Sequence, residues 1–170
     1  MSVTFGKRIF ESLNKQITEE LIIGYTLLSM SSVFADMNLK GCEQWAREQS
    51  QNRLQRSQKI FDHIILRGAK VKLMPIPAPK HDWRAPLHMF EEVSRIEQRT
   101  SGNFTAMVEI ATAEKDYASL NFLQWFVEEQ IKNDAFITYL LDRLRKMQST
   151  DIGVLMFDNE LVSSSKTPSI

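Results

Sequence analysis

Apolar residues recur at intervals of three and four along four segments of similar length, and this spacing constrains the fold more than any other feature. In the first segment the series runs from Ile9 through Leu13, Ile17 and Leu28 to Phe34. Such spacing is typical of an amphipathic helix and not of a strand. It predicts helices at about 6–37, 41–67, 86–113 and 117–148. Four matched helices with one apolar face each predict an all-α four-helix bundle.

The connections between these segments predict the topology. The turn between Asn38 and Gly41 is short, so the first two helices must be antiparallel. Four of the five prolines lie between Pro75 and Pro86. The 18 steps from Gly68 to Pro86 can extend to about 60 Å, whereas a helix of about 28 residues is about 42 Å long. One long crossover is therefore expected, with the second and third helices parallel.

The chain should form a single domain over residues 1–170. A short apolar run after the fourth helix predicts a fifth helix at about 152–161, which we expect to be buried between subunits. With 21 Lys plus Arg and 21 Asp plus Glu, the chain offers no basic field for nucleic acid. No run of 18 apolar residues or secretory core is present, so we expect no membrane partner and a cytoplasmic location.

Polar residues interrupt each apolar stripe at the same height, about 11 to 14 residues into each helix. They are Glu20 in the first helix, Arg53 and Arg56 in the second, Glu97 in the third, and Gln130 with Asn133 beside it in the fourth. Burial of a charged side chain costs free energy unless the charge is paired. A single inward charge would therefore indicate that the inward face of that helix has been assigned wrongly. Four helices that agree at one level instead predict a polar layer inside the bundle.

The chain resembles the bacterial non-haem ferritins in several segments along its length. The segments that carry the resemblance extend from Leu13-Asn14-Lys15-Gln16 through Asn121–Val127 and Glu129-Gln130 to Phe157–Leu161. The resemblance implies a ferritin-like bundle, a homo-oligomeric cage of roughly 24 subunits, and intracellular iron stored inside as mineral. It also implies that the short last helix packs around a symmetry axis. Haem is not expected, because the eight methionines are scattered and more often fill gaps in a core.

The resemblance also implies a di-iron ferroxidase site, but here its ligand set is incomplete. Glu20, Glu97 and Gln130 match the family's ligands, whereas the family's Glu-x-x-His pair falls on Arg53 and Arg56. Asn133 stands where the family has a second acid on the fourth helix, and Leu27 stands where the family has a tyrosine near the iron. Asn52 and Lys132 stand where a third iron position would need acids. Glu129 is retained there as a possible accessory acid, and Tyr25 lies on another face.

Two arginines change the chemistry of this layer, because a guanidinium has five donors and no acceptor and cannot bind a metal. The charges of Glu20, Glu97, Arg53 and Arg56 sum to zero. A ferrous ion about 5 Å from one guanidinium would be repelled by about 6 to 7 kcal/mol at an effective dielectric of about 20. We therefore expect an internal salt-bridge cluster in place of tightly bound iron, with Arg53 bridging Glu20 and Glu97. Ferroxidase activity should be lost or much weakened, and no residue is assigned as catalytic.

Three interpretations of function follow from this layer. The first is a cage subunit that stores iron without a fast ferroxidase step of its own. The second is a structural or regulatory cage subunit without iron oxidation, which could co-assemble with an active ferritin as a hetero-oligomer. The third is an enzyme with a displaced iron site at Glu20, Glu97, Gln130 and His63, although a partly buried structural histidine is the simpler interpretation of His63.

Overall fold

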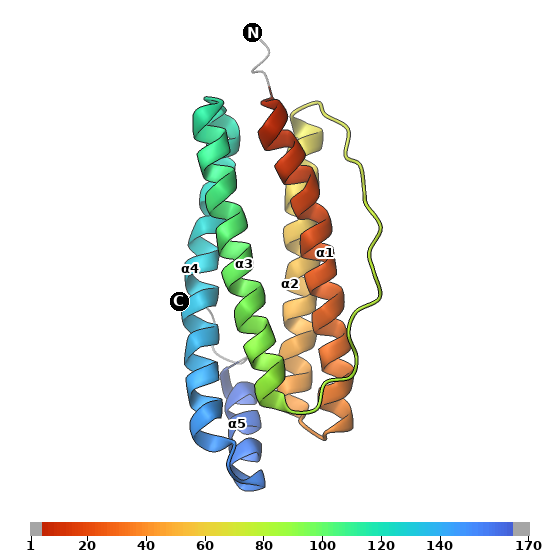
Figure 1. Cartoon of the computed structure of the whole chain (residues 1–170), viewed down its shortest axis with the longest axis vertical. Coiled ribbons are helices and arrows are strands. Elements are labelled where there is room, and N and C mark those ends of the chain that lie inside the picture. Colours follow the sequence, from red (N-terminus) through yellow and green to blue (C-terminus); the bar gives the residue numbers. More distant parts are fainter. Residues whose placement is uncertain (1–4, 165–170) are drawn as a thin grey trace.

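The computed structural model describes residues 5–164 and contains five helices and no strand within that range. The helices are α1 (Lys7–Asp36), α2 (Lys40–Leu66), α3 (Pro86–Ala113), α4 (Tyr117–Met147) and α5 (Asp151–Ser164). The prediction of an all-α bundle with a short last helix is confirmed (Figure 1). α5 is longer than expected, because it begins at Asp151 and continues to Ser164. Residues 1–4 and 165–170 of the expected domain lie outside the described residues.

The crossover connects the end of α2 to the start of α3 at the opposite end of the bundle, so these two helices are parallel (Figure 1). The connecting segment runs along α1 and is held there by hydrogen bonds. Asn14 donates to the carbonyl of Lys72 at 2.9 Å and accepts from its amide at 2.8 Å, and Ser29 donates to the carbonyl of Lys80 at 2.7 Å. The proline-rich segment is therefore an extended strap that leaves the helix faces to pack on one another.

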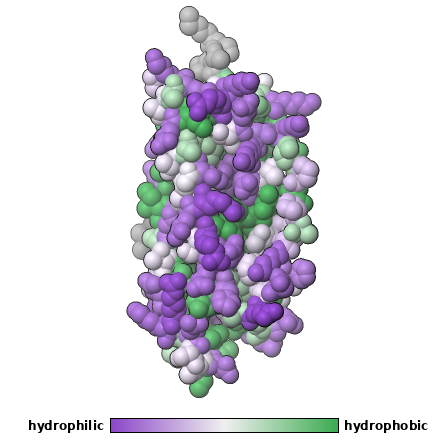
Figure 2. Space-filling view, in the orientation of Figure 1, coloured by the Kyte–Doolittle hydropathy of each residue, from purple (hydrophilic) through white to green (hydrophobic). Residues whose placement is uncertain are grey.

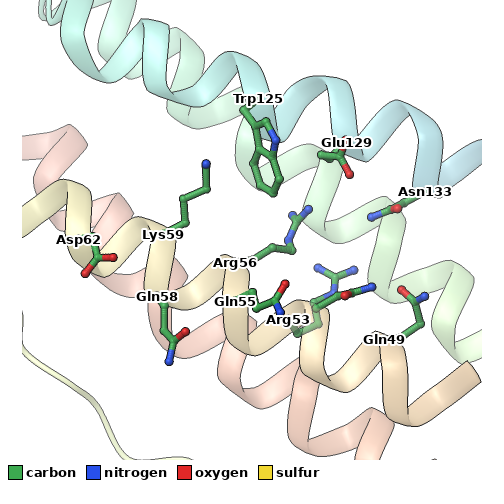
Figure 3. A pocket seen from close by; sticks show the side chains of 11 residues that line it. Gln49, Arg53, Gln55, Arg56, Gln58, Lys59, Asp62, Trp125, Glu129 and Asn133 are labelled. Carbon is green, nitrogen blue, oxygen red and sulfur yellow. The ribbon is translucent and has the colours of Figure 1, made fainter. Parts of the chain in front are cut away.

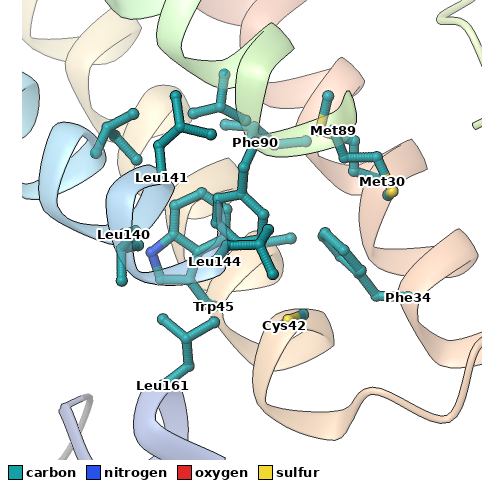
Figure 4. Packing of buried hydrophobic residues seen from close by; sticks show 14 of the residues in the cluster. Met30, Phe34, Cys42, Trp45, Met89, Phe90, Leu140, Leu141, Leu144 and Leu161 are labelled. Atoms are coloured by element: carbon teal, nitrogen blue, oxygen red, sulfur yellow. The ribbon is translucent and has the colours of Figure 1, made fainter. Parts of the chain in front are cut away.

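Two apolar clusters make the core, and the polar layer separates them. One cluster contains Phe34, Trp45 and Phe90 near one end of the bundle, where Figure 4 shows these rings packed with leucines of α4. The other contains Ile60 and Phe104 toward the opposite end. In each of α1 to α4 the inward polar residues fall between the residues of the two clusters. The layer is thus enclosed by apolar side chains on both sides along the bundle axis.

α5 contributes to this core, which the sequence did not indicate. Phe157 is buried, with its ring centroid 5.3 Å from that of Phe90, so the expectation of burial between subunits is wrong for Phe157. Asp158 accepts a hydrogen bond from the Cys42 amide at 2.7 Å and so caps the start of α2. Gly41 permits this approach, since a β-carbon there would lie 2.0 Å from the Asp158 carbonyl oxygen. Ile152, in contrast, is exposed.

The surface mixes charged and apolar side chains (Figure 2). Leu28, which the sequence places on the apolar face of the first helix, is exposed on the isolated chain. Within the described range, none of the helices combines the length and the hydropathy needed to cross a bilayer.

Candidate functional site

The polar layer is buried at the middle of the bundle and is built from four helices. Glu20 on α1 is 0% exposed, Arg53 and Arg56 on α2 are 3% and 5% exposed, and Glu97 on α3 is 7% exposed. Gln130 on α4 completes the layer and is also buried. α1 and α2 can approach closely here because Gly24 has no side chain, and a β-carbon at Gly24 would lie 3.3 Å from that of Arg53. The structure therefore brings all five residues together.

Arg53 joins the two acids. Its Nη1 donates to Glu20 Oε2 at 3.0 Å, and its Nη2 donates to Glu97 Oε1. These are charge-assisted hydrogen bonds from one planar fork to two carboxylates on different helices. Arg53 thus occupies the space between Glu20 and Glu97 that a bridging ligand or a metal ion would need.

Arg56 joins Glu20 to α4. Its Nε and Nη2 donate to the two carboxylate oxygens of Glu20 at 3.0 and 3.2 Å, and Nη2 also donates to Gln130 Oε1 at 3.2 Å. Gln130 in turn donates to Glu97 Oε2 at 2.6 Å, which closes the circuit of hydrogen bonds. The Arg56 guanidinium lies 5.3 and 5.2 Å from the ring centroids of Phe104 and Phe126. Aromatic faces therefore add a cation–π contribution to the ion pairs.

Two neighbours extend the network beyond the residues that the sequence indicated. Gln16 donates to Glu20 Oε1 at 3.1 Å, and Ser101 donates to Asp134 Oδ2 at 2.6 Å beside Gln130. Gln16 precedes Glu20 by one helical turn, which places both side chains on one face. The contact of Gln16 with Glu20 could therefore have been predicted from their spacing in the sequence. The pairing of Ser101 with Asp134 could not, because it depends on how α3 and α4 pack.

The pKa shifts in the layer favour the charged forms. Burial raises the pKa of Glu20, but the guanidiniums of Arg53 and Arg56 outweigh burial and hold that pKa below its ordinary range. Burial likewise lowers the pKa of Arg53, and Glu20 with Glu97 raises it above the ordinary arginine value. Both groups are therefore ionised at neutral pH, and the network is a set of ion pairs.

This arrangement does not fit a di-iron centre. The two oxygens of Glu20 and the two of Glu97 already accept hydrogen bonds from Arg53, Arg56, Gln16 or Gln130. No cluster of three or more His, Cys, Asp or Glu side chains with metal-binding geometry occurs among the described residues. Hard cations such as iron need several oxygen or imidazole ligands, and the two arginines can provide none.

The remaining candidate residues lie around this layer or away from it. Leu27 is buried in the apolar core and Tyr25 is exposed on the surface. Lys132 donates to Glu129 at 3.0 Å on the surface of α4. Asn52, Glu129 and Asn133 line a cavity of about 530 Å³ between α2 and α4, which also exposes part of Arg53 and Arg56 (Figure 3).

His63 belongs to a different part of the bundle. It stacks on Phe122 at a centroid distance of 3.9 Å and lies 3.4 Å from the Ser119 hydroxyl. Burial and the nearby Arg67 lower its pKa below the ordinary histidine value. No contact joins His63 to Glu20, Glu97 or Gln130 within the described part of the chain. The structure thus separates His63 from the acids with which a displaced iron site would need it.

A four-helix bundle with one long crossover and inward carboxylates at mid-height defines the ferritin-like class of proteins. Comparison with known proteins supports the same class, because a family model described as a ferritin-like domain matches residues 10–147. Bacterial non-heme ferritins are similar over most of the chain. The protein of Bacteroides fragilis (strain 638R) is 32% identical over 156 residues, which cover 92% of this chain and 97% of the relative. That of Staphylococcus saprophyticus is 27% identical over 160 residues, covering 94% and 96%.

Solved structures give the same assignment. The open pore ferritin of the archaeon Archaeoglobus fulgidus has a TM-score of 0.90 and 37% sequence identity, covering 93% of this chain and 98% of that one. A structure described as a humanized archaeal ferritin has a TM-score of 0.90 and 36% identity, covering 93% and 96%. The chain belongs to the ferritin family.

The depressed pKa of Glu20 predicts an acid-sensitive contribution to stability. Its contribution is fully present above the ordinary glutamate pKa of about 4.3 and is lost as the pH falls through the lower folded-state value. The difference in unfolding free energy between the wild type and Glu20→Gln should therefore shrink below about pH 4.3, by up to about 1.4 kcal/mol per pH unit. Urea unfolding between neutral and acidic pH tests this.

The comparison between these two proteins isolates Glu20 from other acids. Asp116 also has a pKa below its ordinary value, because hydrogen bonds from Arg67 and Ser119 outweigh the effect of its burial. Asp116 is present in both proteins, so its effect cancels in the difference. A difference that stays constant down to the lowest pH would show that Glu20 is not an ionised partner of the arginines.

Proposed function

We propose that the chain is a ferritin subunit for intracellular iron storage whose bundle does not oxidise iron. The observation that carries this proposal is the double engagement of Glu20 by Arg53 and Arg56 at 3.0 Å each. The relatives named as bacterial non-heme ferritins support the iron-storage part of the proposal. Iron is then the cargo of an assembled cage in the cytoplasm, and the bundle interior holds an ion-pair cluster in the position of the di-iron site.

The electrostatics support the loss of the oxidation step. Two acids and two arginines give the layer a net charge of zero, whereas a site for two ferrous ions needs an excess of negative charge. Iron binding would have to separate the two guanidiniums from Glu20 and Glu97, the buried acids that pair with them. Breaking a buried ion pair in this way costs about 3 to 5 kcal/mol. The metal-free network is therefore the more stable state of the layer.

Assembly into a homo-oligomeric cage is part of the same proposal, and co-assembly with a ferroxidase-competent ferritin is its variant. Apolar side chains exposed on the isolated chain support burial against other subunits. They include Tyr25 and Leu28 on α1, Leu73 and Met74 on the crossover, and Ile152, Leu155 and Met156 on α5. A solved structure that resembles this chain is described as an open pore ferritin. We propose a closed assembly of roughly 24 subunits.

A structural or regulatory cage subunit without iron is the second candidate. It is favoured by the scarcity of acidic clusters, because no group of three or more potential ligands is arranged for a metal in residues 5–164. The two candidates differ in whether an assembled cage takes up iron when oxidation occurs outside the bundle. Incubation of the purified protein with ferrous iron and air, followed by analysis of iron that co-elutes with the cage, separates them.

Anaerobic titration with ferrous iron followed by exposure to oxygen tests the proposed loss of ferroxidase activity. We expect no saturable rapid phase, because the ligands that would define it are paired with arginines. Slow oxidation that scales with total iron and not with protein would agree with this. A rapid phase that saturates at about two irons per subunit, the stoichiometry of a di-iron site, would contradict the proposal.

A further inference from the structure

The cavity between α2 and α4 has features of a binding site that the ion-pair network does not use. Its volume is about 530 Å³, and all the residues that line it except Trp125 are polar or charged. The amide side chains share the ability to donate hydrogen bonds without carrying charge; they are Gln49, Asn52, Gln55, Gln58 and Asn133. Three cations, Arg53, Arg56 and Lys59, line the same space. A cavity of this composition suits a small polar ligand and not an apolar one.

Arg56 keeps one donor for this cavity. Its Nε and Nη2 are engaged by Glu20 and Gln130, while its Nη1 makes no hydrogen bond within the described residues. Among the described residues, the fully buried side-chain nitrogens and oxygens without a hydrogen-bond partner are Thr18 Oγ1 and the indole nitrogens of Trp45 and Trp83, so Arg56 Nη1 is unpaired but not fully buried. The atom is therefore accessible from the cavity. Figure 3 shows the guanidinium directed at the space bounded by Lys59, Trp125 and Glu129.

Lys59 is the second donor at this place. Its ammonium group lies 4.5 Å from the ring centroid of Trp125, which holds the charge against the wall of the cavity. Glu20 and Gln130 hold the Arg56 guanidinium from the side of the buried layer, so the arginine is preorganised before a ligand arrives. A fixed guanidinium, an ammonium and several amides form a donor set that matches the oxygens of a tetrahedral oxyanion.

We propose that this cavity binds a phosphate-class oxyanion, either free phosphate or the phosphoryl group of a small molecule, through Arg56 Nη1 and Lys59. Two acids oppose this, since Asp62 and Glu129 also line the cavity. Glu129 is partly neutralised by Lys132 at 3.0 Å. The site is independent of the proposed handling of iron, because neither donor depends on a metal.

Equilibrium dialysis of the iron-free assembled protein against radiolabelled inorganic phosphate tests the site. We expect saturable binding of one phosphate per subunit. Lys59→Gln should weaken this binding at least about tenfold, because it removes one charge-assisted hydrogen bond. Asp62→Asn with Glu129→Gln should strengthen it, because both changes remove like charge. These residues are surface positions outside the buried ion-pair network, so the variants should retain the fold.

Lys15→Gln is the matched control, since Lys15 is an exposed lysine beside a smaller cavity between α1 and α3. Its phosphate binding should equal that of the wild type. Unlabelled glycerol phosphate and unlabelled inorganic phosphate are then compared as competitors of the labelled phosphate. Stronger competition by glycerol phosphate would identify the phosphoryl group of a small molecule as the ligand, and stronger competition by inorganic phosphate would identify the free anion. The proposal is overturned if phosphate does not saturate, or if Lys59→Gln and Lys15→Gln change its binding equally.

Discussion

Replacement of Arg53 by leucine should lower the free energy of unfolding by about 3 to 5 kcal/mol. Arg53 is 3% exposed and pairs with both Glu20 and Glu97. Without it, Glu20 keeps Arg56 at 3.0 Å, but Glu97 loses its cationic partner and keeps only the Gln130 amide. The cost should therefore arise mainly from Glu97. Guanidinium chloride unfolding followed by far-UV circular dichroism measures it.

Two further variants distinguish the loss of this ion pair from a general effect of removing an arginine. Arg47→Leu removes an exposed arginine from the same helix, paired with Glu43 at 3.3 Å, and should cost about 0 to 1 kcal/mol. Glu97→Gln added to Arg53→Leu should recover part of the lost stability, because it removes the stranded charge. If Arg53→Leu unfolds at the same denaturant concentration as the wild type, the ion-pair network does not stabilise the fold.

Replacing Arg53 by Glu, Arg56 by His and Asn133 by Glu together should create iron binding and rapid oxidation. The layer would then contain Glu20, Glu97 and Gln130 with three added ligands, a set of oxygen and imidazole groups that suits iron. The expected change is the appearance of a saturable oxidation phase at about two irons per subunit, as for a di-iron site. Stopped-flow absorbance after mixing with ferrous iron in air measures this phase.

The same triple variant should show a metal-dependent stability that the wild type lacks. Its layer would carry an excess of buried negative charge without metal, so the apo form should be destabilised. Binding of ferrous or zinc ions to the folded state should raise its melting temperature as metal is added. Asn133→Glu alone is the control, because Arg53 and Arg56 still occupy the layer. A folded triple variant without metal-dependent stabilisation would show that the surrounding layer has lost more than these ligands.

The positions and the order of α1 to α4 could be predicted from the amino-acid sequence alone. Apolar spacing located α1 to α4 to within about one residue at each end, because burial of one face per helix imposes a period near 3.6. The length of the crossover determined that α2 and α3 are parallel. The same periodicity placed Glu20, Arg53, Glu97 and Gln130 at one height, since residues at equal depth in helices of equal length must meet.

The hydrogen-bond partner of each arginine in the layer could not be predicted from the sequence and follows from the packing of the helices. Periodicity gives the direction of a side chain but not its rotamer, so only the packed bundle shows that Arg56 binds both oxygens of Glu20 while Arg53 reaches Glu97. The packing of the helices also decided the place of Phe157, since a 14-residue helix with no clear apolar face carries little directional signal. The separation of His63 from the acids could not be predicted either. Its neighbours Phe122 and Ser119 lie on α4, which is distant in sequence, so only the packed bundle shows these contacts.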